Sequence, residues 1–153
     1  MEWCQGDTAV AEAQVFIIDA SVAVKWYVSE ELRDKALRLR EDFLSEIVDL
    51  EAPGLILYEV GNAIRHHPGA TMRECASAVR ELRNLGIAIR DLDDVAVGVA
   101  AKLAFEEKLT FYDAAYLSLA KTTEATLITA DKELYNQLSN ERKALSQLLE
   151  QYK

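Results

Sequence analysis

Short apolar segments alternate along this chain with longer segments of helical periodicity. The clearest apolar segment is 15–18 (Val-Phe-Ile-Ile), a β-branched run that ends at Asp19 and predicts a strand buried on both faces. Similar short segments at 50–53, 87–89 and 126–129 predict further strands. Because strands alternate with helices, we expect an α/β fold with a central parallel sheet of about four or five strands, flanked by helices on both sides.

Several of the helical segments have recognisable ends. A helix is expected to begin near Ser29, with Glu30 and Glu31 in its first turn, where the helix dipole favours acids. Thr71 and Glu74 form a capping-box pattern for a helix that ends near residue 85. Further helices are predicted over residues 54–66, from Asp93 or Asp94, over 112–122, from Asp131, and over 140–152.

The chain has 153 residues, which fits one domain. Residues 1–14 lack clear patterning and are interpreted as a lead-in to a domain over 15–153. The apolar runs are too short to span a membrane, and the start does not resemble a signal peptide. Two cysteines far apart indicate no disulfide framework. We therefore expect a cytoplasmic protein with no membrane partner.

The net charge of −9 is unusual for a protein that binds nucleic acid. It argues against simple electrostatic binding to RNA. It does not exclude a nuclease, because a carboxylate cluster contributes negative charge and a bound metal ion supplies the local positive field. Any RNA target would have to be recognised locally.

Acidic residues follow two of the expected strands. Asp19 comes directly after the strand at 15–18, and Asp131 follows the strand at 126–129. Ligands of parallel α/β sheets bind beyond the carboxyl ends of the strands, so both acids are candidate site residues. Asp113 near the start of a helix and Glu59 within an apolar helix are two more.

Each acid also has a purely structural interpretation. Asp113 and Asp131 could be helix N-caps, Asp19 could orient a turn with Ser21, and Glu59 could be a solvated residue on an exposed stripe. Together the acids favour another interpretation, because clustered carboxylates repel one another and are costly to bury. Bound Mg²⁺ or Mn²⁺ would remove both penalties. The lack of His or Cys at these positions disfavours zinc.

Four segments around these acids resemble the motifs of PIN domains, specifically the VapC toxins of toxin–antitoxin pairs. They appear in the family's order and cover about residues 15–138. They are FIIDASVAVKW at 16–26, PGLILYEVGNA at 53–63, LTFYDAAYLSLA at 109–120 and LITAD at 127–131.

The resemblance implies a metal-dependent endoribonuclease that is inhibited by a VapB-like antitoxin and forms a homodimer. Helices between residues 30 and 85 would contribute to dimerisation and to a groove for an antitoxin helix. The acids would hold one or two Mg²⁺ or Mn²⁺ ions, with Glu59 completing the cluster or orienting a metal-bound water. Ser21, Asn62 and Thr129 would fix the geometry of the carboxylates.

The C-terminal segment is expected to differ from the family, and two tyrosines near Asp113 are expected to play no part in the site. The family commonly ends with a further short strand, whereas residues 140–153 look helical here, so this sheet edge is expected to be missing or different. Tyr112 and Tyr116 could contact RNA bases, but we expect them to pack inside the fold.

Other functions remain open at the level of sequence. One is a PIN nuclease that processes RNA without an antitoxin, and another is a PIN-like module that binds proteins without catalysis. A phosphatase that uses a strand-end Asp is weaker, because Asp19-Ala20-Ser21 lacks the second Asp two residues on that haloacid-dehalogenase-like enzymes carry.

Overall fold

A parallel sheet of five strands lies at the centre of the computed structural model, which describes residues 11–153. Its order is β3-β2-β1-β4-β5, and every neighbouring pair is parallel. The predicted α/β fold is therefore confirmed. The predicted lead-in lies largely outside the described residues. The strands are β1 (Gln14–Ile18), β2 (Val48–Pro53), β3 (Ala88–Arg90), β4 (Thr126–Thr129) and β5 (Ser146–Leu148).

The central strand is β1, which pairs with β2 on one side and β4 on the other. Phe16, Ile17 and Ile18 are all buried, as expected for a strand covered on both faces. The backbone N–H of Asp19 donates to the carbonyl of Ile128 at 3.1 Å, which ties the ends of β1 and β4 together. The acid after the first strand is thus fixed at the carboxyl edge of the sheet.

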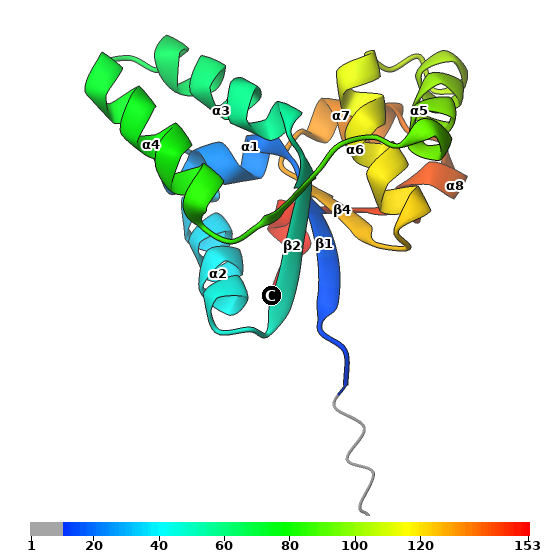
Figure 1. The fold of residues 1–153 in the computed structure, drawn as a ribbon, viewed down its shortest axis with the longest axis horizontal. Helices are drawn as coiled ribbons and strands as arrows, with labels where there is room; N and C mark the ends of the chain where they lie inside the picture. Colours follow the sequence, from blue (N-terminus) through cyan, green and yellow to red (C-terminus); the bar gives the residue numbers. More distant parts are fainter. Residues whose placement is uncertain (1–10) are drawn as a thin grey trace, which may run out of the picture.

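Helices cover both faces of this sheet (Figure 1). Helix α2 packs against β2 on one side, and α6 packs across β1, β2 and β4 on the other, with α5 behind it. Helices α3 and α4 pack against each other and follow the carboxyl end of β2. The helices are α1 (Ala20–Ala23), α2 (Arg33–Leu44), α3 (Leu55–His66), α4 (Met72–Asn84), α5 (Asp94–Glu106), α6 (Phe111–Thr122), α7 (Lys132–Gln137) and α8 (Asn140–Lys143), with 3₁₀ turns η1 (Val24–Trp26) and η2 (Leu149–Gln151).

Most helix ends agree with the sequence. The capping box of Thr71 and Glu74 opens α4, and the Asp93 side chain caps α5. The expected helix start near Ser29 was wrong, because α2 begins at Arg33. Leu32 has a left-handed φ of 63°, which interrupts the helix. None of the described helices is long and apolar enough to cross a membrane.

The prediction of a continuous helix over residues 140–152 was also wrong. Only α8 is α-helical there, and it is followed by β5, which pairs with β4. The open edge of β4 offers unpaired backbone groups, which a short apolar segment can satisfy as a strand. Leu148 and Leu149 are buried as a result. The final strand that we expected to be missing is therefore present.

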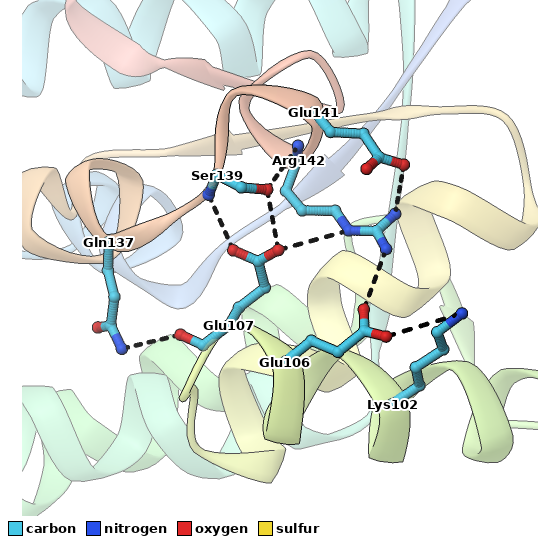
Figure 2. Close-up of polar contacts among 7 residues, drawn as sticks. All are labelled: Lys102, Glu106, Glu107, Gln137, Ser139, Glu141 and Arg142. Carbon is cyan, nitrogen blue, oxygen red and sulfur yellow. Dashed lines mark hydrogen bonds and ion pairs between the residues drawn. The ribbon is translucent and has the colours of Figure 1, made fainter.

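Buried charge fixes the C-terminal segment to α5 (Figure 2). The Arg142 guanidinium lies 3.4 Å from Glu106, 3.6 Å from Glu107 and 3.5 Å from Glu141. Glu107 also accepts hydrogen bonds from the Ser139 backbone N–H at 2.8 Å and hydroxyl at 2.9 Å. We call these residues the Arg142 cluster. A buried cation is here surrounded by carboxylates of the same chain, as burial of a charge requires.

Candidate active site

The Asp19 carboxylate is buried and held by two hydroxyl groups. Its Oδ2 atom accepts hydrogen bonds from Ser21 Oγ and Thr129 Oγ1, each at 2.7 Å. Ser21 lies in α1, directly after β1, and Thr129 ends the neighbouring strand β4, so the two donors meet at the same edge of the sheet. The structure thus brings Asp19, Ser21 and Thr129 together at the carboxyl edge, where the sequence placed a site.

The two hydroxyl groups are themselves fixed by backbone donors. Ser21 Oγ accepts from the Ala130 N–H at 3.0 Å, and Thr129 Oγ1 accepts from the Asp131 N–H at 3.1 Å. Each hydroxyl therefore accepts from the backbone and donates to Asp19. Because two hydrogen bonds hold each hydroxyl group, the hydroxyl groups in turn fix the orientation of the Asp19 carboxylate.

Asp131 lies at the N-terminus of α7, and its side chain is exposed. Its Oδ1 atom accepts a hydrogen bond from the Leu134 N–H at 3.0 Å, which caps the helix. The interpretation of Asp131 as an N-cap is therefore confirmed. A carboxylate has about four lone-pair sites, so the cap leaves acceptor capacity for another ligand.

Asp113 lies in the first turn of α6 and does not cap it. The cap is Thr110, whose hydroxyl accepts from the Asp113 N–H at 3.1 Å. The interpretation of Asp113 as an N-cap was therefore wrong. A Thr three residues before an acid at a helix start is a capping pattern, so the sequence did carry this signal. The half-buried Asp113 carboxylate is left available to the site.

Glu59 on α3 faces Tyr116 on α6. Glu59 Oε1 and the Tyr116 hydroxyl are both buried without a hydrogen-bond partner among the described residues. Glu59 is half-buried, so the interpretation as a solvated residue was wrong. Tyr116 packs in the core as expected, but the sequence did not reveal its proximity to Glu59. Tyr112 is 62% exposed, so the expectation that it packs inside was wrong.

The acids act on one another electrostatically. Burial is the largest effect on the pKa of Asp19 and raises it, and the charge of Asp131 raises it further. The hydrogen bonds from Ser21 and Thr129 lower the same pKa. Burial also raises the pKa of Asp113, as do the charges of Asp19 and Asp131. Asp19, Asp113 and Asp131 therefore lie within electrostatic reach of one another at one edge of the sheet.

Glu59 belongs to the same group. Burial is the largest effect on the pKa of Glu59 and raises it. The charges of Asp19 and Asp113 also raise this pKa. The nearby Tyr116 hydroxyl lowers it, although the two groups do not meet hydrogen-bond geometry. Burial and the charges of Asp19 and Glu59 likewise raise the pKa of Tyr116. We call Asp19, Glu59, Asp113 and Asp131 the carboxylate cluster.

This cluster has no ion-paired cation among residues 11–153. Within residues 11–153, no ion pair to a Lys, Arg or His involves any of its members. In the same part of the chain, no group of three or more His, Cys, Asp or Glu residues is close enough to enclose a metal ion. The acids of the cluster thus lie near one another but do not surround a common position that one metal ion could fill.

Of the three residues expected to fix the carboxylates, Asn62 differs from Ser21 and Thr129, because its side chain makes no hydrogen bond to an acid of the cluster in residues 11–153. It lies one helical turn after Glu59 on α3, is exposed, and lines a groove between α3 and α4. A role beside Glu59 stays a prediction.

Comparison with known proteins identifies the family. The PIN domain sequence model matches residues 16–137, so the chain belongs to the PIN domain family. Two relatives from Pyrobaculum aerophilum are each 30% identical to it. Exonuclease VapC9 aligns over 78% of this chain and 82% of its own length, and Ribonuclease VapC3 over 77% and 90%. The resemblance to VapC-like PIN proteins is confirmed.

Solved structures agree with the fold. PAE2754 from Pyrobaculum aerophilum is 27% identical, with a TM-score of 0.58 over 90% of this chain and 92% of that chain. VapBC2 from Rickettsia felis, bound to a DNA fragment from its promoter, has a TM-score of 0.64 over 88% and 98%. At 13% identity the second likeness concerns the fold alone.

Proposed function

We propose that this protein is a metal-dependent endoribonuclease of the VapC toxin type, which hydrolyses phosphodiester bonds of RNA at the carboxylate cluster. The observation that carries the proposal is the uncompensated negative charge of the cluster at the carboxyl edge of the sheet. The nuclease names of the VapC relatives support the same assignment.

The residues present fit a hydrated divalent ion better than an enclosed one. Mg²⁺ usually keeps several waters and binds through one or two carboxylates together with substrate phosphates. A cluster that is not closed around a point agrees with that mode, and the buried, unpartnered Glu59 Oε1 is an oxygen in need of a donor or cation. Asp19, Asp113 and Asp131 would hold one or two Mg²⁺ or Mn²⁺ ions, with Glu59 completing the set. Such an ion lowers the pKa of water and stabilises charge on phosphate oxygens.

The chain's own groups would divide the work between them. Asp19 supplies a carboxylate of fixed orientation, because Ser21 and Thr129 hold one of its oxygens. Asp131 supplies an exposed oxygen beside its helix cap. Glu59 would accept a proton from a water molecule, a role that its raised pKa favours; burial and the charges of Asp19 and Asp113 raise that pKa.

We also propose a VapB-like antitoxin as inhibitor. A groove of about 630 Å³ lies between α3 and α4 and is lined mainly by small and apolar side chains, including the exposed Met72. An amphipathic helix suits such a groove. Co-expression with the product of an adjacent gene, followed by a cleavage assay, tests this point. Homodimer formation stays a prediction that sedimentation of the purified chain can test, and cytoplasmic location also stays a prediction.

The deciding experiment compares RNA cleavage by the wild type and Asp19→Asn. Single-stranded and structured RNAs are incubated with Mg²⁺, with Mn²⁺ or with EDTA. We expect cleavage only with metal, and a loss of about a thousandfold in Asp19→Asn, since removing a metal-binding carboxylate forfeits several kcal/mol of transition-state stabilisation. The matched control is Asp49→Asn, an exposed acid on β2, which should cleave as the wild type does.

Other outcomes would assign the protein differently. Cleavage in EDTA, or an undiminished Asp19→Asn variant, contradicts the mechanism. Metal-dependent cleavage without any inhibitory partner would favour RNA processing. Absence of cleavage under every condition would favour a PIN-like module that only binds proteins.

A further inference from the structure

A second cavity is lined by residues that are next in sequence to two acids of the carboxylate cluster. It has a volume of about 460 Å³ and is formed by the start of α3, the loop after β3 and the start of α6. Tyr58 and Tyr112 line it, and each directly precedes an acid of the cluster, Glu59 or Asp113. We call this cavity the aromatic pocket; its lining includes Pro53, Leu57, Tyr58, Leu92, Phe111 and Tyr112.

The aromatic side chains of the pocket are unusually exposed. Tyr58 is 79% exposed, Tyr112 62% and Phe111 47%, whereas Tyr116, one helical turn further along α6, is only 1% exposed. Large apolar side chains gathered at one place on a surface mark a binding site. Since the rings come from the two helices that also carry Glu59 and Asp113, a ligand in the pocket would adjoin the carboxylate cluster.

The charges of the pocket determine what kind of ligand suits it. Arg90 is the one cation among its lining residues, and both oxygens of Glu51 already accept hydrogen bonds from it, at 2.7 and 3.0 Å. Asp91 also lines the pocket, and the whole chain carries a net charge of −9. The described lining of the pocket therefore offers no free cation to bind a phosphate. It suits a flat, uncharged group that stacks on aromatic rings.

We infer that the aromatic pocket binds an unpaired nucleobase of the RNA, adjacent to the phosphodiester bond held at the carboxylate cluster. The inference rests on the proposed function and adds to it the form of the substrate. Stacking on Tyr58 and Tyr112 gives an acidic protein an affinity for RNA that does not depend on phosphate contacts. It also restricts cleavage to single-stranded segments, because a paired base cannot enter the pocket.

The test isolates stacking from both metal and phosphate charge. The probe is a ten-nucleotide single-stranded oligonucleotide with uncharged methylphosphonate linkages and one central 2-aminopurine, whose fluorescence falls when it stacks. It is titrated with the full chain in EDTA. We expect quenching by the wild type and by Tyr112→Phe, which keeps the ring, and a loss of affinity of about tenfold in Tyr58→Ala and Tyr112→Ala. Phe105→Ala is the matched control, because Phe105 is 89% exposed and does not line the pocket.

The failure of this inference can be told apart from failure of the proposed function. Quenching that Tyr112→Ala abolishes supports the pocket even where no RNA is cleaved. An RNA-cleaving wild type without quenching, or alanine variants that quench normally, overturns the pocket and leaves the nuclease standing. The inference is also overturned where Tyr58→Ala and Tyr112→Ala turn a dimer into a monomer in sedimentation with unchanged quenching, since the aromatic rings would then be a contact with a second copy.

Discussion

Two groups of buried charge in this protein are built in opposite ways. In the Arg142 cluster, a guanidinium that is only 8% exposed is surrounded by three carboxylates within 3.6 Å (Figure 2). In the carboxylate cluster, burial and the charges of neighbouring acids raise the pKa values of Asp19, Glu59 and Asp113, and no Lys, Arg or His of residues 11–153 forms an ion pair with the cluster.

The difference shows where the chain supplies its own opposite charge. Where the C-terminal segment meets α5, the chain supplies the cation Arg142 to Glu106 and Glu107. At the carboxyl edge of the sheet it supplies only hydroxyl donors to Asp19 and leaves Glu59 Oε1 unpartnered. A buried charge without a partner is costly, which supports the proposal that a cation from outside the chain compensates the second group.

Removing the cation of the compensated group should have the largest effect on stability. Arg142→Ala leaves Glu107 buried without its partner, and we expect a loss of about 3 kcal/mol in the free energy of unfolding, with metal-dependent cleavage retained by the folded fraction. Urea denaturation measures this change. The control is Lys102→Ala, an exposed pair with Glu106 at 3.8 Å, which should change stability by no more than about 0.5 kcal/mol. Equal effects of the two variants would contradict the comparison.

A smaller effect is expected when one donor to Asp19 is removed. Thr129→Val keeps the shape of the side chain but deletes a hydrogen bond of 2.7 Å, so the carboxylate loses its fixed orientation. Groups that orient a metal-binding carboxylate contribute about 10- to 100-fold to metal affinity or activity. We expect a loss of that size in the rate of RNA cleavage. Thr126→Val on the same strand is the control, and a similar loss in that variant would show that the strand, not Asp19, is affected.

The smallest effect on stability is expected at Tyr116, whose buried hydroxyl faces Glu59. Tyr116→Phe removes a buried hydroxyl that has no hydrogen-bond partner, so stability should stay equal or rise by up to about 1 kcal/mol. A loss of more than about 2 kcal/mol in the unfolding free energy would mean that the hydroxyl is satisfied after all.

The sequence predicted the sheet and the positions of its acids well. A β-branched run ending at Asp19 is a local signal, and the rule that ligands bind at the carboxyl edge needs no further information. The position of β5 could not be predicted in this way, because its helical pattern was overridden by the open edge of β4. The start of α2 depended on the backbone angle of Leu32, which composition does not reveal.

The site shows the same limit. The strand ends placed Asp19 and Asp131 at one edge of the sheet, and the resemblance to PIN domains added Ser21 and Thr129 to the site. In the sequence both Asp113 and Asp131 are possible helix caps, although Thr110, three residues before Asp113, already carries a capping pattern for α6. The meeting of Glu59 with Tyr116 depends on how α3 and α6 pack, which no local pattern contains.

The most direct test of the uncompensated cluster is the thermal stability of the full chain against pH and metal. The folded protein holds the pKa values of Asp19, Glu59 and Asp113 above their ordinary values of 3.8 and 4.5, so it binds more protons than the unfolded chain. In EDTA, the contribution of these groups therefore lowers stability as the pH rises through and above that range.

Melting temperatures are recorded in EDTA from pH 4.5 to 7.5, and then at pH 7.5 with increasing Mn²⁺. We predict that the melting temperature falls with rising pH, and that Mn²⁺ at about a hundredfold its dissociation constant restores about 5–10 °C. Asp19→Asn should show a weaker fall and little response to Mn²⁺, whereas Asp49→Asn should behave as the wild type. A wild type that does not respond to Mn²⁺, or an Asp19→Asn variant that responds equally, would contradict the account.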